Sequence, residues 1–402
     1  MRVTLHYGRE HLECDVPDGN RIAVAPPQTP VETVPDLGKA VWEALEAPLG
    51  FPPLRKALTP DDHVTIVVDK RLPCLVELLV PILSHLGEAQ VPPAAVTVLG
   101  STALTPDDLR GRLPGQFRGV RVEAHAPGDR KRLSYLATTK AGRRLYLDRA
   151  VVDADQVVVL SGRGYDPRLG YSGGEGCLFP ALSDDETLAE TNGRLSMDVP
   201  NERSQGLAKE AAEAAWLLGA PFFVQVIPGK GDDTAAILAG PADSCAEGRR
   251  QLDARWRRTV PERARTVVAT VSGDPARQGF AELAAAAAHA SRVVQPNGRI
   301  VVLSSITPEL GTAEEILRQA DSPEDGLARL ENNKPPNMAA AFQWANAARD
   351  ARIYLLTGLP ADVAEEMFAV PLNDVQQAIR MLNEQGSCLI LDDAHKTLAV
   401  LE

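Results

Sequence analysis

The sequence predicts an α/β protein built from two doubly wound, Rossmann-like domains with a cleft between them, preceded by an N-terminal β-hairpin. Short β-rich runs alternate with helical patterns along almost all of the chain, which is typical of βαβ units with parallel strands. Most of these runs are continuously apolar, as expected for strands that helices cover on both faces. At 402 residues, the chain is also long for a single core.

The predicted elements begin with the hairpin, in which 3–7 and 11–16 flank a turn at Gly8. Apolar strands then follow at 64–68, 96–99, 156–160, 222–227, 267–271, 300–303, 353–356 and 389–391. Helical patterns between them include 75–86, 202–218, 242–256, 278–293 and 373–383. The polar segment 322–336, which ends in two prolines, is expected to be a loop over the cleft.

The clearest domain boundary lies near 257–265, where a long helical pattern ends and Pro261 precedes a new strand. We therefore expect an N-terminal domain over 1–258, to which 389–402 returns, and a C-terminal α/β domain over 262–388.

The composition argues against several classes of protein. The net charge is −12 and the acids and bases are mixed, so no basic stripe is available to bind the phosphates of a nucleic acid. The start of the chain lacks the pattern of a secretory signal, and no apolar run approaches the roughly 18 residues that span a bilayer. The five cysteines form no CxxC pair and the seven histidines show no HxxxH spacing, so no disulfide framework or metal site is expected. We expect a cytoplasmic protein without a membrane partner.

A glycine-rich stretch at 170–177 is the most informative local motif. Four glycines in the seven residues 170–176 would let backbone N–H groups converge on an anion, although a flexible connection is the alternative. Cys177 ends this stretch, either as a small buried side chain or as a reactive thiolate. Generic nucleotide signatures are incomplete, because Pro167 stands where the third glycine of GxGxxG would follow Gly162 and Gly164.

A charged triplet, Asp69-Lys70-Arg71, follows the predicted strand 64–68. Ligands gather at the carboxyl ends of strands in open α/β sheets, and cationic side chains there can hold a phosphate or carboxylate. A solvated charged loop is the alternative interpretation.

Six stretches occur in a recognisable order along the chain: Leu5-His6-Tyr7-Gly8, 41–54, 67–73, 169–180, 237–240 and 272–278. Together they resemble the nickel-pincer lactate racemase family, which has "AL..PiGspPL" at 41–54, "sDhTRP" at 67–73 and "aGfSGGrKsvlPG" at 169–180. Their order and spacing match over nearly the whole chain, so the resemblance implies the fold of that family.

The resemblance also implies a chemistry, because the family shuttles the α-hydride of a 2-hydroxy acid on a nickel pincer nucleotide. One lysine carries that cofactor covalently, histidines bind nickel or act as acid and base, and an arginine, a glutamine and a lysine assist. These positions fall here on Gly176 (the lysine), on Asp166 or Pro167, Asn192 and 101–105 (the histidines), on Leu72 beside Arg71 (the arginine), and on Glu282 and Ala285. The covalent nickel-pincer nucleotide is therefore expected to be absent, and no other cofactor is assigned.

The sequence thus predicts a divergent, lactate-racemase-like protein whose interdomain cleft binds a small anion, either a nucleotide or a 2-hydroxy acid. Its expected cofactor-binding residues are Asp69, Lys70, Arg71, Ser172, Gly173 and Gly174, its substrate-binding residues are Arg277 and Gln278, and its only catalytic candidates are Asp166 and Glu175. Two alternatives stay open. One is a catalytically silent paralogue that acts as a partner or regulator, and the other is a 2-hydroxy-acid racemase or epimerase with rearranged ligands. A homo-oligomer or a paralogous partner fits any of these.

Overall fold

The computed structural model describes residues 2–15, 21–69, 72–102, 104–198, 200–336, 338–382 and 386–402. It divides into two compact units, which we name by their main sheets. The six-stranded unit comprises Glu32–Gly229 and Asp233–Leu252, and the five-stranded unit comprises Met1–Val31, Lys230–Asp232 and Asp253–Glu402. These bounds differ from those expected, because both 1–31 and 389–402 belong to the five-stranded unit.

The main sheet of the six-stranded unit has the strand order β12-β11-β8-β3-β4-β5. Its strands are β3 (Val64–Val68), β4 (Val96–Gly100), β5 (Arg121–Ala124), β8 (Gln156–Gly162), β11 (Phe222–Pro228) and β12 (Thr234–Gly240). All neighbours are parallel except β11 and β12, which form an antiparallel edge. The smaller elements of this unit are α3 (Pro106–Arg112), α4 (Arg149–Val152), η1 (Leu54–Lys56), η2 (Pro93–Ala95), η3 (Gly115–Phe117), η4 (Arg130–Arg132) and the hairpin β6 (Leu133–Thr138)–β7 (Arg144–Asp148).

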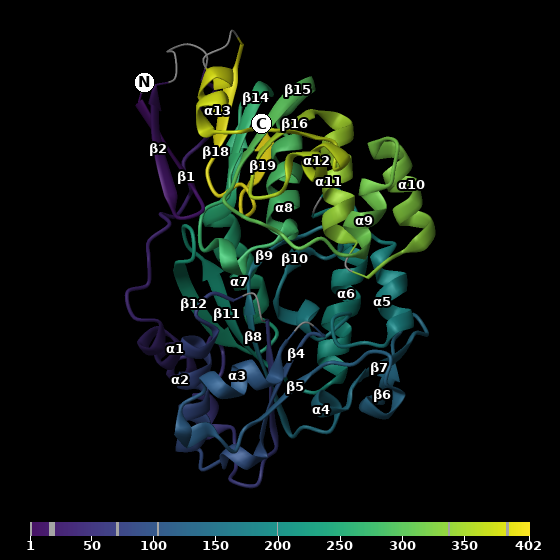
Figure 1. Cartoon of the computed structure of the whole chain (residues 1–402). Coiled ribbons are helices and arrows are strands. Elements are labelled where there is room, and N and C mark those ends of the chain that lie inside the picture. Colours follow the sequence, from purple (N-terminus) through teal and green to yellow (C-terminus); the bar gives the residue numbers. More distant parts are fainter. Residues whose placement is uncertain are drawn as a thin grey trace. The chain divides into compact units, whose positions relative to one another are not determined.

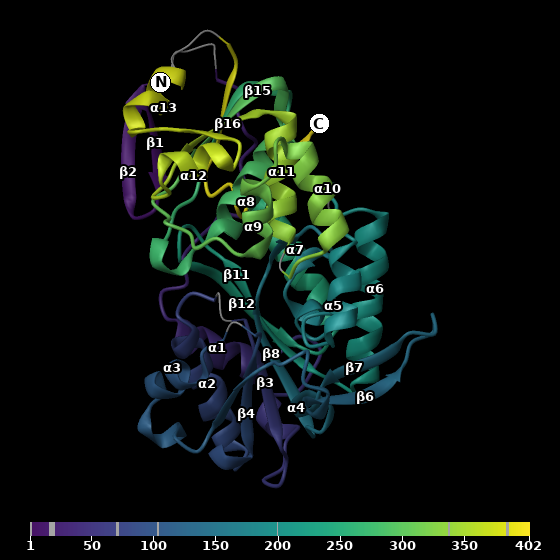
Figure 2. The ribbon, with the colours of Figure 1, turned by 45° about the vertical axis from the view of Figure 1, so that its right-hand side comes forward.

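Helices cover both faces of this sheet. Ile66 of β3 lies in one core with Leu45 of α1 (Leu37–Glu46) and Leu79 of α2 (Leu75–Glu88). Val67, the next residue along β3, lies in a second core with Leu207 of α6 (Glu202–Leu217). Because successive side chains of a strand point to opposite faces, these two cores lie on opposite sides of the sheet. Figure 2 shows α5 (Asp185–Asn192) and α6 side by side. The doubly wound fold class is thus confirmed.

The winding direction reverses between β3 and β8. From β3 the chain adds β4 and then β5 on one side, and later places β8 and β11 on the other side of β3. In open α/β sheets the crevice outside the carboxyl ends of the strands at such a switch point is where ligands bind. The short antiparallel strands β9 (Gly164–Asp166) and β10 (Gly170–Ser172) and the 3-10 turn η5 (Gly174–Cys177) follow the carboxyl end of β8.

The five-stranded unit has an all-parallel main sheet with the order β17-β16-β15-β14-β18. Its strands are β14 (Ala264–Thr270), β15 (Val294–Leu303), β16 (Arg352–Leu356), β17 (Ala369–Pro371) and β18 (Cys388–Leu391). Its helices are η6 (Pro275–Arg277), α8 (Phe280–Ser291), α9 (Thr312–Arg318), α10 (Pro323–Asn333), α11 (Ala339–Asp350), α12 (Ala361–Glu366) and α13 (Val375–Leu382). Figure 1 shows α8 and α11 next to one another, and the rings of Phe280 and Trp344 join them at a centroid distance of 5.3 Å.

The N-terminal hairpin packs on the five-stranded sheet. Strands β1 (Arg2–Tyr7) and β2 (Glu10–Asp15) pair antiparallel, as the sequence predicts, and Leu5 lies in one core with Val301 of β15. Near the end of the chain, β19 (Leu398–Leu401) pairs in parallel with β13 (Arg257–Val260). Both pairings lie within the five-stranded unit. Segment 389–402 therefore packs in this unit, and not in the N-terminal domain to which it was expected to return.

The segment expected to be a loop at 322–336 is largely helix α10, so that prediction is wrong. Ser322 caps the helix by accepting from the backbone N–H of Asp325 at 3.2 Å. Arg329 pairs with Asp325 one turn earlier at 2.8 Å, which supports a polar helix. Among the described residues, no helix is long and apolar enough to cross a membrane.

Candidate ligand site in the six-stranded unit

The glycine-rich loop requires glycine at two successive positions. Gly173 has a φ of +76° and Gly174 a φ of +58°, both in the left-handed region. A Cβ on Gly173 would lie 2.3 Å from the carbonyl oxygen of Gly162, and a Cβ on Gly174 would lie 2.5 Å from Nη2 of Arg163. The loop therefore packs directly against the carboxyl end of β8 and the residue that follows it.

Part of the expected anion nest is used inside the protein. The N–H of Gly174 donates to Oγ of Ser161 at 2.9 Å. Ser172 belongs to β10, where it pairs with Gly164 of β9. The convergence of free backbone donors that the sequence predicts is correspondingly smaller, so side chains must supply more of any affinity for an anion.

Arg163 lies beneath the loop and is only 4% exposed. Its Nε and Nη2 donate to Oε1 of Gln225 at 2.8 and 2.5 Å, and its Nη1 donates to the carbonyl oxygen of Ser172 at 3.4 Å. Gln225 of β11 in turn donates from Nε2 to Oγ of Ser244 at 3.0 Å, at the start of α7 (Ser244–Trp256). A Cβ on Gly248 would lie 1.9 Å from Oε1 of Gln225, so α7 approaches this pair closely.

Glu175 pairs with an arginine of α7. It is 9% exposed, and its Oε2 lies 3.6 Å from Nη1 of Arg249 on α7. The thiol of Cys245 hydrogen-bonds with both Glu175 and Arg163, and burial raises the pKa of this thiol to about 12, so it stays protonated. Glu175 is thus a paired carboxylate within a buried polar cluster, and its expected role as acid or base stays untested.

Asp166 has a structural role at the end of β9. Its Oδ1 accepts from the backbone N–H groups of Arg168 at 2.8 Å and Leu169 at 3.0 Å, and its Oδ2 lies 3.3 Å from Nη2 of Arg168. Burial alone would raise the pKa of this carboxyl, but the charge of Arg168 and these hydrogen bonds outweigh it and lower the pKa. A carboxylate held ionised in this way is a poor general acid near neutral pH.

Asp69 lies at the carboxyl end of β3, as expected, and this end is at the switch point. Its backbone N–H donates to the carbonyl oxygen of Leu160 of β8 at 3.1 Å, which places it between the carboxyl ends of β3 and β8. Lys70 and Arg71, the expected cations of the site, lie outside the described residues. Leu72 follows them and is buried against Gly162.

Arg277 and Gln278 belong to the five-stranded unit. Nη2 of Arg277 pairs with Oδ2 of Asp232 at 2.5 Å, and its Nε lies 3.6 Å from Asp274. Nε2 of Gln278 donates to the carbonyl oxygen of Ser272 at 2.7 Å, while its buried Oε1 has no partner among the described residues. Their role in substrate binding stays a prediction.

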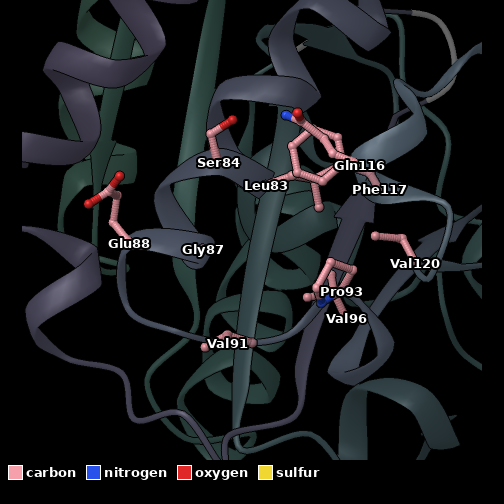
Figure 3. A pocket seen from close by; sticks show the side chains of 10 residues that line it. All are labelled: Leu83, Ser84, Gly87, Glu88, Val91, Pro93, Val96, Gln116, Phe117 and Val120. Atoms are coloured by element: carbon pink, nitrogen blue, oxygen red, sulfur yellow. The ribbon is translucent and has the colours of Figure 1, made fainter.

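Two surface hollows in the six-stranded unit lie away from the loop. One, of about 310 Å³, is lined largely by apolar side chains at the end of α2 and around η3, including Leu83, Val91 and Phe117 (Figure 3). The other lies beside α6 and is lined mainly by charged residues, including Arg143 and Glu210. None of the candidate residues lines either hollow. In the described part of the chain, no group of three or more His, Cys, Asp or Glu residues could hold a metal ion.

The sequence analysis did not identify Arg163, Gln225, Cys245 and Arg249 as site residues. Arg163 stands between the two glycines of the incomplete GxGxxG pattern, which is the one local signal that could have drawn attention to it. Gln225 follows it by 62 residues, and Cys245 and Arg249 come later still, so only the fold brings them together.

An open, mostly parallel sheet with a glycine-rich loop at its switch point defines a doubly wound α/β protein. Residues 7–205 match the family model of the lactate racemase N-terminal domain, so this part of the chain is lactate-racemase-like. The resemblance found in the sequence is thereby confirmed.

Two solved structures share the fold at low sequence identity. The lactate racemase apoprotein from Thermoanaerobacterium thermosaccharolyticum has a TM-score of 0.82 at 15% identity, with 100% of each chain covered. A protein from Thermotoga maritima has a TM-score of 0.65 at 13% identity, covering 91% of this chain and 98% of that one. A search of curated proteins found no match.

Proposed function

We propose that this chain is a divergent lactate-racemase-like protein that binds a small anion, a nucleotide or a 2-hydroxy acid, without a covalently attached nickel-pincer nucleotide. The main support is the position of the glycine loop, which follows β8 at the switch point of the sheet. Asp69 lies at the same point, where its N–H donates to a carbonyl oxygen of β8. The binding residues in this proposal are Asp69, Lys70, Arg71 and the loop residues Ser172, Gly173 and Gly174. The polar cluster beneath the loop, centred on buried Arg163, supports it.

The residues at the tether position do not fit the covalent group. Gly176, which aligns with the tethering lysine, has no amine, and a Cβ there would already lie 2.7 Å from Cδ1 of Leu169. The family's histidine positions fall on Asp166 or Pro167, on Asn192 and in 101–105, which contains no histidine. Asp166 is used in a turn, and Asn192 is buried in α5. Racemisation needs a base on each face of the substrate, so these replacements support ligand binding over racemisation by the family mechanism.

The direct test is calorimetric titration of the protein with AMP, inorganic phosphate and lactate. We expect binding of at least one of these at millimolar concentration or below. Arg71→Ala should weaken it by about ten- to a hundred-fold, because one charge-assisted hydrogen bond contributes about 1.5–3 kcal/mol. Arg130→Ala, which removes an exposed arginine of η4, is the matched control and should leave the affinity unchanged.

Intact mass tests the cofactor part of the proposal. After co-expression with cofactor-forming enzymes, the mass should equal that of the polypeptide, and an increase of nucleotide size would contradict us. If the protein binds none of the three probes at millimolar concentration, the ligand-binding proposal fails and the silent paralogue takes its place. Bound nickel together with a nucleotide absorption band would instead favour the racemase with rearranged ligands.

A further inference from the structure

The polar cluster beneath the glycine loop carries an unbalanced charge. It contains two guanidinium groups, those of Arg163 and Arg249, and one carboxylate, that of Glu175, which lies 3.6 Å from Arg249. The remaining members, Gln225 and the protonated thiol of Cys245, are neutral. One positive charge of the cluster is therefore not neutralised by any carboxylate in it.

Arg163 is the cation that the fold fixes. It is almost fully buried, and its direct acceptors are a side-chain amide, a backbone carbonyl and the neutral thiol of Cys245, none of which carries a charge. Burying a charge without an opposite charge costs free energy, and no carboxylate forms an ion pair with Arg163 among the described residues. Glu175 supplies the only carboxylate of the cluster, so it cannot neutralise both arginines.

Arg249 is the cation that a ligand can reach. Its side chain is 37% exposed, and its contact with Glu175, at 3.6 Å, is longer than the 2.7–2.9 Å that is typical of a charge-assisted hydrogen bond. The guanidinium thus lies beside η5 with its donors not committed to that carboxylate. Its neighbour Arg250 differs, because it makes short contacts of 2.7 and 2.5 Å with Glu247 and points to solvent.

We propose that Arg249 is a ligand-binding residue and that the group it binds is a phosphate. This inference rests on the proposed function, since it concerns the same loop. A planar guanidinium matches the several oxygens of a phosphate through paired hydrogen bonds. A phosphate ester carries about −1.5 to −2 charges near neutral pH, so an uncompensated positive charge attracts it more strongly than it attracts the single charge of a 2-hydroxy acid. Glu175 opposes binding and limits its affinity.

The test compares four single variants by calorimetric titration with AMP and inorganic phosphate. Arg249→Gln should weaken binding by about ten-fold, which corresponds to the loss of one charge-assisted hydrogen bond. Glu175→Gln should strengthen binding several-fold, because it removes the opposing charge. Arg250→Gln, one residue along the same helix, should change nothing. Arg249→Lys retains the charge and should keep part of the affinity, which guards against a loss caused by misfolding.

The outcomes separate this inference from the proposed function. If AMP binds the wild type and Arg249→Gln behaves like Arg250→Gln, Arg249 is only the structural partner of Glu175 and the inference is overturned, while the binding proposal stands. If lactate binds but AMP and phosphate do not, the inference is again overturned and a 2-hydroxy acid is the ligand. If none of the three probes binds, the proposed function and the inference fail together.

Discussion

Nε and Nη2 of Arg163 both donate to a single acceptor, Oε1 of Gln225, at 2.8 and 2.5 Å, and both side chains are buried. Through this pair, the residue that follows β8 is tied to β11, and through Ser244 to the start of α7. Gln225 therefore satisfies two donors of a cation that has no ion-pair partner within 4 Å among the described residues.

Gln225→Leu should destabilise the protein strongly. It leaves two guanidinium donors of Arg163 unsatisfied in the interior, which costs about 2–4 kcal/mol of unfolding free energy. Urea denaturation monitored by circular dichroism measures the loss. Gln116→Leu, at an exposed position of η3, is the control and should stay within about 0.5 kcal/mol. A double variant, Arg163→Met with Gln225→Leu, should regain part of the loss. Equal destabilisation by Gln225→Leu and Gln116→Leu would argue against this account.

Gly174→Ala should destabilise the protein and disturb the loop. The residue has a φ of +58°, and the new Cβ would lie 2.5–2.8 Å from the buried guanidinium of Arg163. The backbone strain alone costs on the order of 1 kcal/mol, and the displaced arginine adds to it. Gly206→Ala, on the exposed side of α6 with open space around it, should instead be neutral or stabilise by up to about 1 kcal/mol. Thermal unfolding measures the melting temperatures of both variants. Equal melting temperatures would rule out the close approach of Gly174 to Arg163.

His289 should make the protein sensitive to acid. It is buried in α8, its Nδ1 lies 2.7 Å from the carbonyl oxygen of Ala394, and burial lowers its pKa to about 4. In the unfolded chain its pKa is about 6.5, so between these values the unfolded state binds more protons and stability falls as the pH falls. This group alone should remove about 2 kcal/mol between pH 7.5 and pH 5. In His289→Gln, the difference in unfolding free energy between pH 7.5 and pH 5 should shrink by that amount. An unchanged difference would contradict the buried neutral imidazole.

The five cysteines should react unequally with iodoacetamide. Cys14, Cys245 and Cys388 are buried, and burial raises the pKa of the Cys245 thiol to about 12 and that of Cys388 to about 11. Cys74 and Cys177 are half-buried. Because the thiolate is the reacting form, brief labelling of the native protein at neutral pH should modify Cys74 and Cys177 first, and urea should expose the other three. Early modification of Cys245, located by peptide mass spectrometry, would contradict the cluster around Glu175.

Local apolar patterns were sufficient to predict most of the sheet. The run 64–68 is strand β3 without a shift, because five consecutive apolar or β-branched residues can be buried on both faces only in a covered sheet. The apolar pattern failed where polar interactions decide. Segment 322–336 is polar, yet a serine cap and an ion pair along the chain support a helix there. The hairpin β6–β7 shows only a half-buried pattern and was not predicted.

The candidate site could be predicted only in part for the same reason. Asp69 follows a strand end in the sequence, so the rule that ligands gather at strand carboxyl ends made it a candidate, and the density of glycines made the loop one. Arg163 and Gln225 share no local pattern, and nothing in a linear spacing of 62 residues shows that one amide accepts two hydrogen bonds from one arginine. Charge balance in a buried cluster is likewise a property of the folded chain.

The division of the chain gives the molecule the genetic organisation of a domain insertion. The six-stranded unit is encoded as one stretch, 32–252, which interrupts the sequence of the five-stranded unit. Within that stretch, only residues 230–232 belong to the five-stranded unit. Both sides of that insertion meet, since the N–H of Thr29 donates to the carbonyl oxygen of Ala254 at 2.9 Å. A gene in which a short linker joins residue 31 to residue 253 would therefore encode the five-stranded unit as a continuous chain. A simple truncation to 253–402 would lack the β1–β2 hairpin and with it part of a hydrophobic core.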